Sequence, residues 1–348
     1  MSDRQHLNVA LWLLGICLII FCMISLGGVT RLTGSGLSMV QWAPITGLLP
    51  PLNEQQWIAV FKLYQASPEF VSVNSGMGLE GFKAIFWFEY FHRLLGRLIG
   101  ISFFVPMVYF FVRYPLSAKL KLQLLGLFVL GGLQGLMGWY MVKSGLVNDP
   151  HVSQYRLVAH LALALLLYIA IFWLGSGHFI RHWVQRYDSP KWLTRATTLL
   201  LILVFITVLA GGFVAGTRAG FAFNTFPLMN GSLVPQGYVA LEPWWRNLFE
   251  NIASVQFNHR LLATLVLAMA ATLAWLAYKT PLKPTLKRLY MVTLLFILLQ
   301  YALGVLTLLY YVPVALGAIH QATAVLVLSS SLFLVRVQAQ LRVASYRY

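Results

Sequence analysis

The stretch FEYFHRLLGR at residues 88–97 returns later in the chain as VQFNHRLLAT at 255–264. Both are apolar runs with a His-Arg-Leu-Leu motif, and in both an acid or amide side chain stands one helical turn before the histidine. That side chain is Glu89 in the first copy and Gln256 in the second. The chain therefore builds the same helix twice and keeps the carboxylate in one copy only.

The similarity continues on both sides of these two segments. Matching residues keep the same order in each half, and each half contains four long apolar runs. The further matching pairs are Gly27-Gly28 with Gly211-Gly212, GGLQGLMGWY at 131–140 with LQYALGVLTL at 299–308, and AHLALALLL at 159–167 with IHQATAVLVL at 319–328. Because four crossings return the chain to the same side, we expect a pseudo-twofold axis along the membrane normal. We predict two domains, residues 1–182 and 183–348.

Composition places the chain in a membrane. Of its 348 residues 59% are hydrophobic and only 10% are charged, whereas soluble domains average about 25% charged residues. Runs of about 20 apolar residues can span a bilayer as helices. Eight such runs predict an all-α integral membrane protein whose eight transmembrane helices form two pseudo-symmetric four-helix bundles: 8–29, 85–112, 120–142, 155–177, 193–215, 253–278, 287–311 and 315–337.

The net charge of +16 would suggest nucleic acid in a soluble protein, but the positive-inside rule explains it here. Most of the 25 Lys and Arg residues fall on the side that holds both termini, as in the loop with Arg181, Arg186, Lys191 and Arg195. Both termini are therefore predicted to be cytoplasmic, with the lipid bilayer and no nucleic acid as partner. The short segment before the first span has no room for an organelle transit peptide, so we predict a multi-pass protein of the bacterial inner membrane.

Two long outer loops, residues 30–84 and 216–252, contain aromatic segments at 53–65 and 242–252. Their Trp and Tyr residues are typical of interfacial helices at the level of the lipid headgroups. We predict that both segments are such helices and that they cover the outer mouths of the bundles.

Small residues suggest where helices approach one another. Gly96-x-x-x-Gly100 and Gly131-x-x-x-Gly135 have the spacing found in helices that pack closely in membranes. Both cysteines lie in the first span, where they predict packing residues and neither a disulfide nor a zinc site.

Four histidines lie inside predicted spans, one in each even-numbered helix: His92, His160, His259 and His320. At about 1.5 Å per residue, all four lie within roughly 10 Å of the outer boundary. One intramembrane histidine could be a hydrogen-bonded packing residue, but four at one depth, two in each half, indicate axial ligands. The simplest explanation is an iron porphyrin between two imidazoles in each bundle. Zinc takes three or four protein ligands, so two histidines per half argue against it.

Arginines and one carboxylate accompany these histidines. Three arginines on the outer side could bind porphyrin propionates, with snorkelling to lipid headgroups as the alternative: Arg93, Arg97 and Arg260. Glu89 and His92 share a helix face, so the first site could carry out acid–base chemistry beside a porphyrin. Gln256 cannot move a proton, so the second site could hold a cofactor or relay electrons.

The motifs GGVTRLTGSGLSM at 27–39, PEF at 68–70, EYFHRLLGR at 89–97, FNHR at 257–260 and IHQ at 319–321 resemble those of the heme A synthase family, in its mitochondrial and alphaproteobacterial type. The resemblance covers almost the whole chain, and its block at 27–97 is the most specific. Some members carry a cysteine pair in the first outer loop. This chain has none there, so it resembles the cysteine-free branch.

The resemblance implies an eight-helix oxidoreductase acting on a CH group. Such an enzyme oxidises the methyl group of heme O to the formyl group of heme A for cytochrome oxidase, with water as the oxygen source. It further implies that His259 and His320 ligate a resident heme b, whereas His92 and His160 hold the substrate heme beside Glu89, which matches the family's catalytic carboxylate. A heme O synthase and cytochrome oxidase assembly factors are the expected partners, and a homo-oligomer is compatible with the sequence.

The main alternative is a di-heme b-type membrane protein that transfers electrons from quinol. It explains the four histidines but gives Glu89 no role. A transporter is a weaker alternative, because it would need polar residues along a path through the midplane, where these helices are almost entirely apolar.

Overall fold

The computed structural model describes residues 1–42, 46–146, 152–180 and 189–345. Eight of its helices are long and apolar enough to cross a membrane, which confirms the predicted all-α membrane fold. Across the described ranges the backbone forms no strand, only an isolated bridge between Met229 and Ser232. The eight helices are α1 (Asp3–Leu32), α4 (Leu79–Arg113), α5 (Ala118–Gly145), α6 (Gln154–Phe179), α7 (Lys191–Gly216), α8 (Ile252–Lys279), α9 (Pro284–Leu309) and α10 (Val314–Ser345).

The helices extend beyond the apolar runs that predicted them, because polar residues continue and cap them. α1 begins with a capping box in which Ser2 and Gln5 each accept a hydrogen bond from the other's backbone N–H. Such reciprocal bonds satisfy donors that a helix start leaves open. Hydropathy alone therefore placed the spans correctly and most of their ends too far inward; the exception is α9, which was predicted to end at 311 and ends at Leu309.

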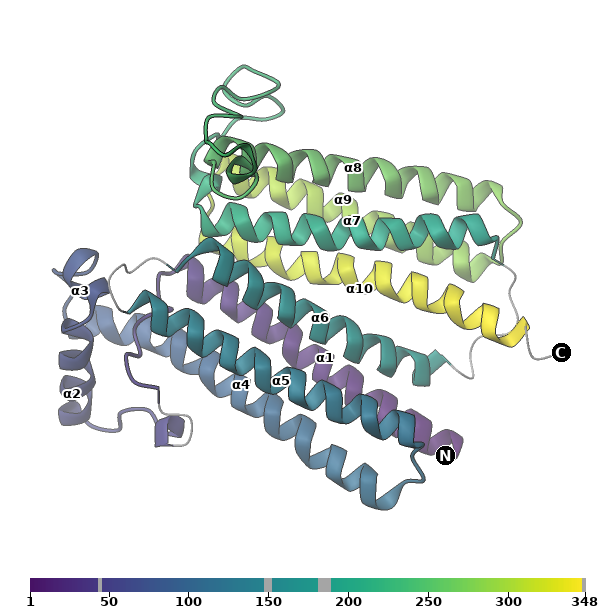
Figure 1. Ribbon diagram of the computed structural model, residues 1–348, viewed down its shortest axis with the longest axis horizontal. Helices are drawn as coiled ribbons and strands as arrows, with labels where there is room; N and C mark the ends of the chain where they lie inside the picture. Colours follow the sequence, from purple (N-terminus) through teal and green to yellow (C-terminus); the bar gives the residue numbers. More distant parts are fainter. Residues whose placement is uncertain (43–45, 147–151, 181–188, 346–348) are drawn as a thin grey trace.

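Each half forms a ring of four helices, drawn as the lower and upper groups in Figure 1. In the first half α1 and α5 each pack against both α4 and α6, and in the second half α7 and α9 each pack against both α8 and α10. Helices α4 and α6 therefore lie diagonally across the first ring, as α8 and α10 do across the second. The two bundles and their pseudo-symmetry are confirmed, and all four histidine-bearing helices occupy equivalent diagonal places.

The seam between the halves is formed by α1 and α6 against α7 and α10. Gly28 of α1 lies against the side chain of Gln321, whose Nε2 donates to the Ile24 carbonyl over 2.7 Å. The equivalent Gly212 of α7 lies against Val158 of α6. Because small residues allow close helix approach in lipid, the second glycine of each double-glycine pair closes this seam.

Within the described chain, three of the four glycines in the two predicted GxxxG motifs make no close helix contact. Gly100, Gly131 and Gly135 face open space, and Gly96 approaches only the side chain of Met23. The spacing is common in membrane helices, and it does not say which face of a helix is covered. Close approaches are made instead by other glycines, among them both double glycines. Both cysteines are free, as predicted, with Cys17 buried and Cys22 exposed.

Both outer loops lie at one end of the molecule, and the start of α1 and the end of α10 lie at the other (Figure 1). The aromatic segment at 53–65 forms the predicted helix, α2 (Glu54–Gln65), followed by the short α3 (Pro68–Ser72). Its aromatic face packs against α4, where Tyr64 stacks on Phe82 and Trp57 meets Phe86 edge-on.

The second aromatic segment does not form the predicted α-helix. Residues Trp244–Leu248 make only a short 3-10 helix, η4, because the Asn247 side chain bonds the carbonyls of Leu241 and Trp244 and holds the chain in a turn. The predicted boundary between the halves at 182 and 183, like Arg181 and Arg186, lies outside the described residues.

Candidate functional site

The structure brings the four predicted histidines together in two pairs, one inside each bundle. His92 of α4 interacts electrostatically with His160 of α6, and His320 of α10 with His259 of α8. The two members of each pair come from the diagonal helices of their own ring. The pairing is therefore within halves and not across the seam.

The donor set fits a flat macrocycle better than a bare ion. Among the described residues, no three His, Cys, Asp or Glu side chains come close enough to hold a metal ion. In each pair one buried ring nitrogen lacks a hydrogen-bond partner within the described chain, Nδ1 of His92 and Nδ1 of His320. Buried polar atoms are normally satisfied. An unpartnered ring nitrogen in each histidine pair is compatible with a heme held between the two imidazoles of that pair.

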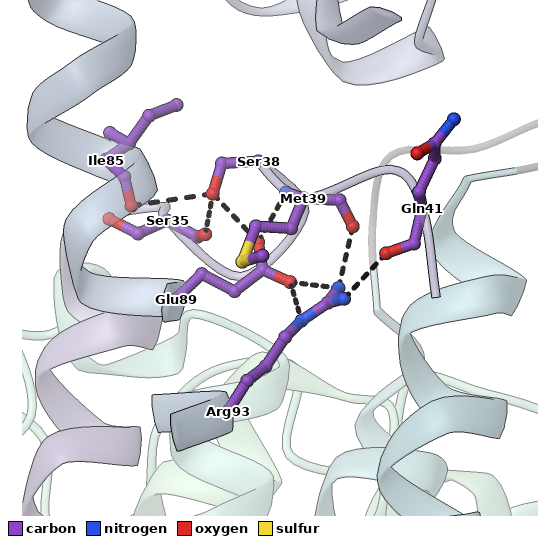
Figure 2. Close-up of polar contacts among 7 residues, drawn as sticks. All are labelled: Ser35, Ser38, Met39, Gln41, Ile85, Glu89 and Arg93. Atoms are coloured by element: carbon purple, nitrogen blue, oxygen red, sulfur yellow. Dashed lines mark hydrogen bonds and ion pairs between the residues drawn. The ribbon is translucent and has the colours of Figure 1, made fainter. Parts of the chain in front are cut away.

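Glu89 is buried, with only 3% of its surface exposed, and its carboxylate accepts four hydrogen bonds (Figure 2). Oε2 accepts from the Ser38 hydroxyl and from the Met39 N–H, both at 2.8 Å. Oε1 accepts from Nε and Nη2 of Arg93 at 3.0 and 2.6 Å. Four donors, two of them from a guanidinium, match the lone pairs of an ionised carboxylate. Glu89 is thus a fixed negative charge beside the first histidine pair.

Arg93 fastens the outer loop to α4. Besides Glu89, its Nη2 donates to the Met39 carbonyl at 2.6 Å and its Nη1 to the Gln41 carbonyl at 2.9 Å. The guanidinium also lies over the Trp42 ring, 5.6 Å from its centroid. Arg93 therefore holds Glu89 and the loop together. The further predicted arginine, Arg97, lies one turn later on α4.

The second half repeats this clamp without the carboxylate. Arg260 donates to the carbonyls of Phe223 and Thr225 at 2.6 and 2.9 Å, and to Oε1 of Gln256 at 3.0 Å. Whereas Glu89 only accepts hydrogen bonds, Gln256 also donates one, from its Nε2 to the Ala219 carbonyl at 2.7 Å. The outer loops match this difference: the first loop donates hydrogen bonds to Glu89, and the second loop accepts one from Gln256. The asymmetry between the halves is thus built into both helix and loop.

Sequence reasoning missed the polar contacts that hold the histidine rings. Gln134 of α5 donates to the His160 carbonyl and lies 3.2 Å from its ring Nδ1, and Gln300 of α9 lies 3.4 Å from Nε2 of His320. The ring of His259 instead faces the Thr207 carbonyl at 3.1 Å. The signal for the glutamines was present, because both occupy matched places in GGLQGLMGWY and LQYALGVLTL.

Glu69 of the PEF motif was also missed as a site residue. It is buried in α3, where its Oε2 accepts from the Tyr64 hydroxyl at 3.1 Å, and Asn74 donates to the same hydroxyl at 2.7 Å. Burial raises the pKa of Glu69 to about 7; the Tyr64 hydroxyl opposes this rise, and the negative charge of Glu89 adds to it. A second buried carboxyl thus lies in the outer segment, close enough to Glu89 for the two charges to interact.

Comparison with known proteins decides the family. Residues 10–332 match a family model described as cytochrome oxidase assembly protein, COX15-CtaA. The chain is 48% identical over 333 residues to a protein named heme A synthase from Nitrosospira multiformis, covering 93% of this chain and 92% of the relative. The chain belongs to the heme A synthase family. The match begins in α1 and ends in α10, so it includes all eight membrane helices and both histidine pairs.

Two further members of the heme A synthase family extend the comparison. A heme A synthase from Nitrosomonas eutropha is 48% identical over 335 residues, covering 96% of this chain and 94% of the relative. A protein of Arabidopsis thaliana named heme A synthase COX15 is 44% identical, covering 94% of this chain and 73% of the relative. The family resemblance drawn from the motifs is confirmed.

Proposed function

We propose that this protein oxidises the methyl group of heme O to the formyl group of heme A, taking the oxygen atom from water, in the assembly of cytochrome oxidase. Conversion of a methyl group and one water to a formyl group releases four protons and four electrons, so the enzyme is an oxidoreductase acting on a CH group. Relatives named heme A synthase align with more than 90% of this chain. The observation that carries the proposal is the buried carboxylate of Glu89 beside the first histidine pair, where the second pair has the neutral Gln256.

The two halves take different roles in this proposal. Residues 1–182 hold the substrate heme through His92 and His160, beside Glu89. Residues 183–348 hold a resident heme b through His259 and His320. When bound there, heme b supplies a one-electron relay that passes electrons from the substrate to an external oxidant. The neutral Gln256 supports this division, because a relay site has no proton to exchange.

Glu89 acts from a fixed position. Its four donors fill the lone pairs that a carboxylate offers, so it could take a proton from water only if one donor left. The Ser38 hydroxyl is the donor most easily exchanged, since it can turn to the Ser35 carbonyl, which lies 3.0 Å away. We expect Glu89 either to stabilise positive charge that develops at the methyl carbon or to accept a proton through the Ser38 position.

Arg97, one turn beyond Arg93 on α4, is the third predicted arginine that could bind a propionate. Arg93 and Arg260 could do so only in addition to clamping their loops. The protein spans a bacterial inner membrane with both termini in the cytoplasm, which agrees with its charge distribution, and it receives heme O from a heme O synthase.

The test is heme extraction from cells that express the protein with a supply of heme O. We expect heme A from the wild type and, from Glu89→Gln, bound heme O or its alcohol intermediate with a loss of roughly 10²-fold or more in heme A. Glu80→Gln is the matched control, because Glu80 lies on the same helix with its side chain 84% exposed. A wild-type amount of heme A from cells that express Glu89→Gln would show that Glu89 has no catalytic role. Heme b alone from the wild type would favour the electron-transfer alternative.

A further inference from the structure

Each of the four histidine rings lies against a glycine of the membrane helix that precedes the histidine's own membrane helix in the chain. A Cβ atom added to any of these glycines would lie 2.9–3.0 Å from the Cε1 atom of the facing imidazole. The pairs are Gly27 with His92, Gly138 with His160, Gly211 with His259 and Gly304 with His320.

The contact is specific to these glycines. On α1, Gly15 has nothing within 4 Å of an added Cβ, and on α5 the same holds for Gly131, Gly132 and Gly135. A glycine in a helix interior costs roughly 1 kcal/mol relative to alanine. The four that touch a histidine therefore occupy places where a methyl group would not fit unless the ring moved.

The position of the contact on the ring gives it a directional effect. Cε1 lies between the two ring nitrogens, so a glycine that abuts it limits rotation of the ring plane about the Cβ–Cγ bond. The plane of an axial imidazole affects the electronic state of the iron that it binds, because ligand orientation is one of the ways a protein tunes a heme. The double glycines therefore divide two tasks: Gly27 and Gly211 face a histidine, while Gly28 and Gly212 close the seam.

Polar contacts hold three of the four rings in addition. In these three cases a residue four positions before the glycine, on the same helix as the glycine, contacts the histidine ring. Gln134 contacts His160, Gln300 contacts His320, and the Thr207 carbonyl contacts His259. His92 has no such polar contact among the described residues, and its Nδ1, like Nδ1 of His320, has no hydrogen-bond partner there. His92 is thus the ring that Gly27 contacts without a hydrogen bond beside it, and it belongs to the half proposed to exchange its heme.

We propose that Gly27, Gly138, Gly211 and Gly304 are positioning residues that set the imidazole planes of the four axial ligands, with His92 the least constrained of them. This inference rests on the proposed function, in that the histidines must bind hemes. An alanine at any of these positions should shift the ring by a few tenths of an ångström without removing the ligand. The largest change is expected for Gly27→Ala, since no polar contact holds His92 in place.

The test uses the purified full-length protein in detergent, loaded with ferric protoporphyrin IX, and reads the low-spin electron paramagnetic resonance spectrum and the midpoint potential of each heme. We expect each of the four Gly→Ala variants to shift the signal of the heme in its own half. The controls Gly15→Ala and Gly135→Ala should match the wild type. Alanine favours helix, and the thermal unfolding midpoint checks the fold. If one variant does not accumulate, the alanine variant of the other histidine-contacting glycine in the same half provides the test for that half.

The outcomes separate the two proposals. A wild type that shows no bis-histidine low-spin signal would contradict the proposed function itself. A wild type with normal signals, together with four alanine variants that are indistinguishable from it, would overturn the positioning role and leave the proposed function standing. Equal shifts in the two control variants would also overturn it, because the effect would then come from helix packing in general.

Discussion

At the scale of single residues, Glu69 gives the outer segment a pH dependence. Its folded-state pKa is about 7 because it is buried, whereas an exposed glutamate titrates near about 4.3. Between these values the folded state binds more protons than the unfolded state, so stability falls as pH rises through this window. We therefore predict that the segment formed by α2 and α3 is better protected at pH 6 than at pH 8.

Hydrogen exchange, corrected for the intrinsic rate at each pH, measures this protection over residues 54–72. In Glu69→Gln the difference between pH 6 and pH 8 should disappear, because an amide does not titrate and can still accept from the Tyr64 hydroxyl. The exposed Glu80→Gln should keep the wild-type difference. An unchanged pH dependence in Glu69→Gln would show that another group is responsible.

At the scale of elements, Arg93 and Arg260 are matched clamps between a helix and its outer loop, and they separate structure from chemistry. A lysine has one nitrogen and cannot reach two loop carbonyls and a helix side chain together. Each lost bond to a charged group costs about 1.5–3 kcal/mol. Both Arg93→Lys and Arg260→Lys should therefore loosen their loops, but only Arg93→Lys should also release Glu89 and lower heme A output.

Limited proteolysis of the outer loops and heme extraction from the same preparations measure the two effects. Faster cleavage is expected in residues 30–53 for Arg93→Lys and in residues 216–243 for Arg260→Lys. Equal losses of heme A in the two variants would show that the clamps act only through folding. The Glu89–Arg93 pair would then carry no function of its own.

Sequence reasoning predicted the elements that depend on hydropathy and repetition. It failed for contacts that depend on which face of a helix packs against its neighbours. Eight spans, two rings and the pairing of His92 with His160 follow from apolar runs and matched depth. Gly131 and Gly135 were expected at a helix contact and face open space, whereas Gly138, one turn later, holds a histidine. A helix of apolar residues on all sides has little hydrophobic asymmetry, so nothing in the sequence marks its covered face.

At the scale of the whole molecule, the two bundles share one helix arrangement but differ at the buried residue one turn before the first histidine of each pair. The first holds the ion pair of Glu89 and Arg93, joined by 2.6 Å, and the second holds the neutral Gln256. Breaking a buried ion pair costs about 3–5 kcal/mol, so this charge belongs to the structure of the first bundle. Each half should bind its own heme, and loss of a ligand in one half should leave the other half occupied.

We therefore predict that His259→Ala and His320→Ala, purified from cells without heme O, lose the absorbance of the resident heme, while His92→Ala keeps it. The reason is that the second bundle places both its ligands and its Gln256–Arg260 clamp independently of α4 and its loop. Reduced-minus-oxidised difference spectra measure the pigment, and His178→Ala is the control, because His178 pairs with His6 at the opposite end of the helices. An unchanged low-spin spectrum in His259→Ala would place the resident heme elsewhere. Equal loss in His92→Ala would mean that the two sites form one cooperative unit.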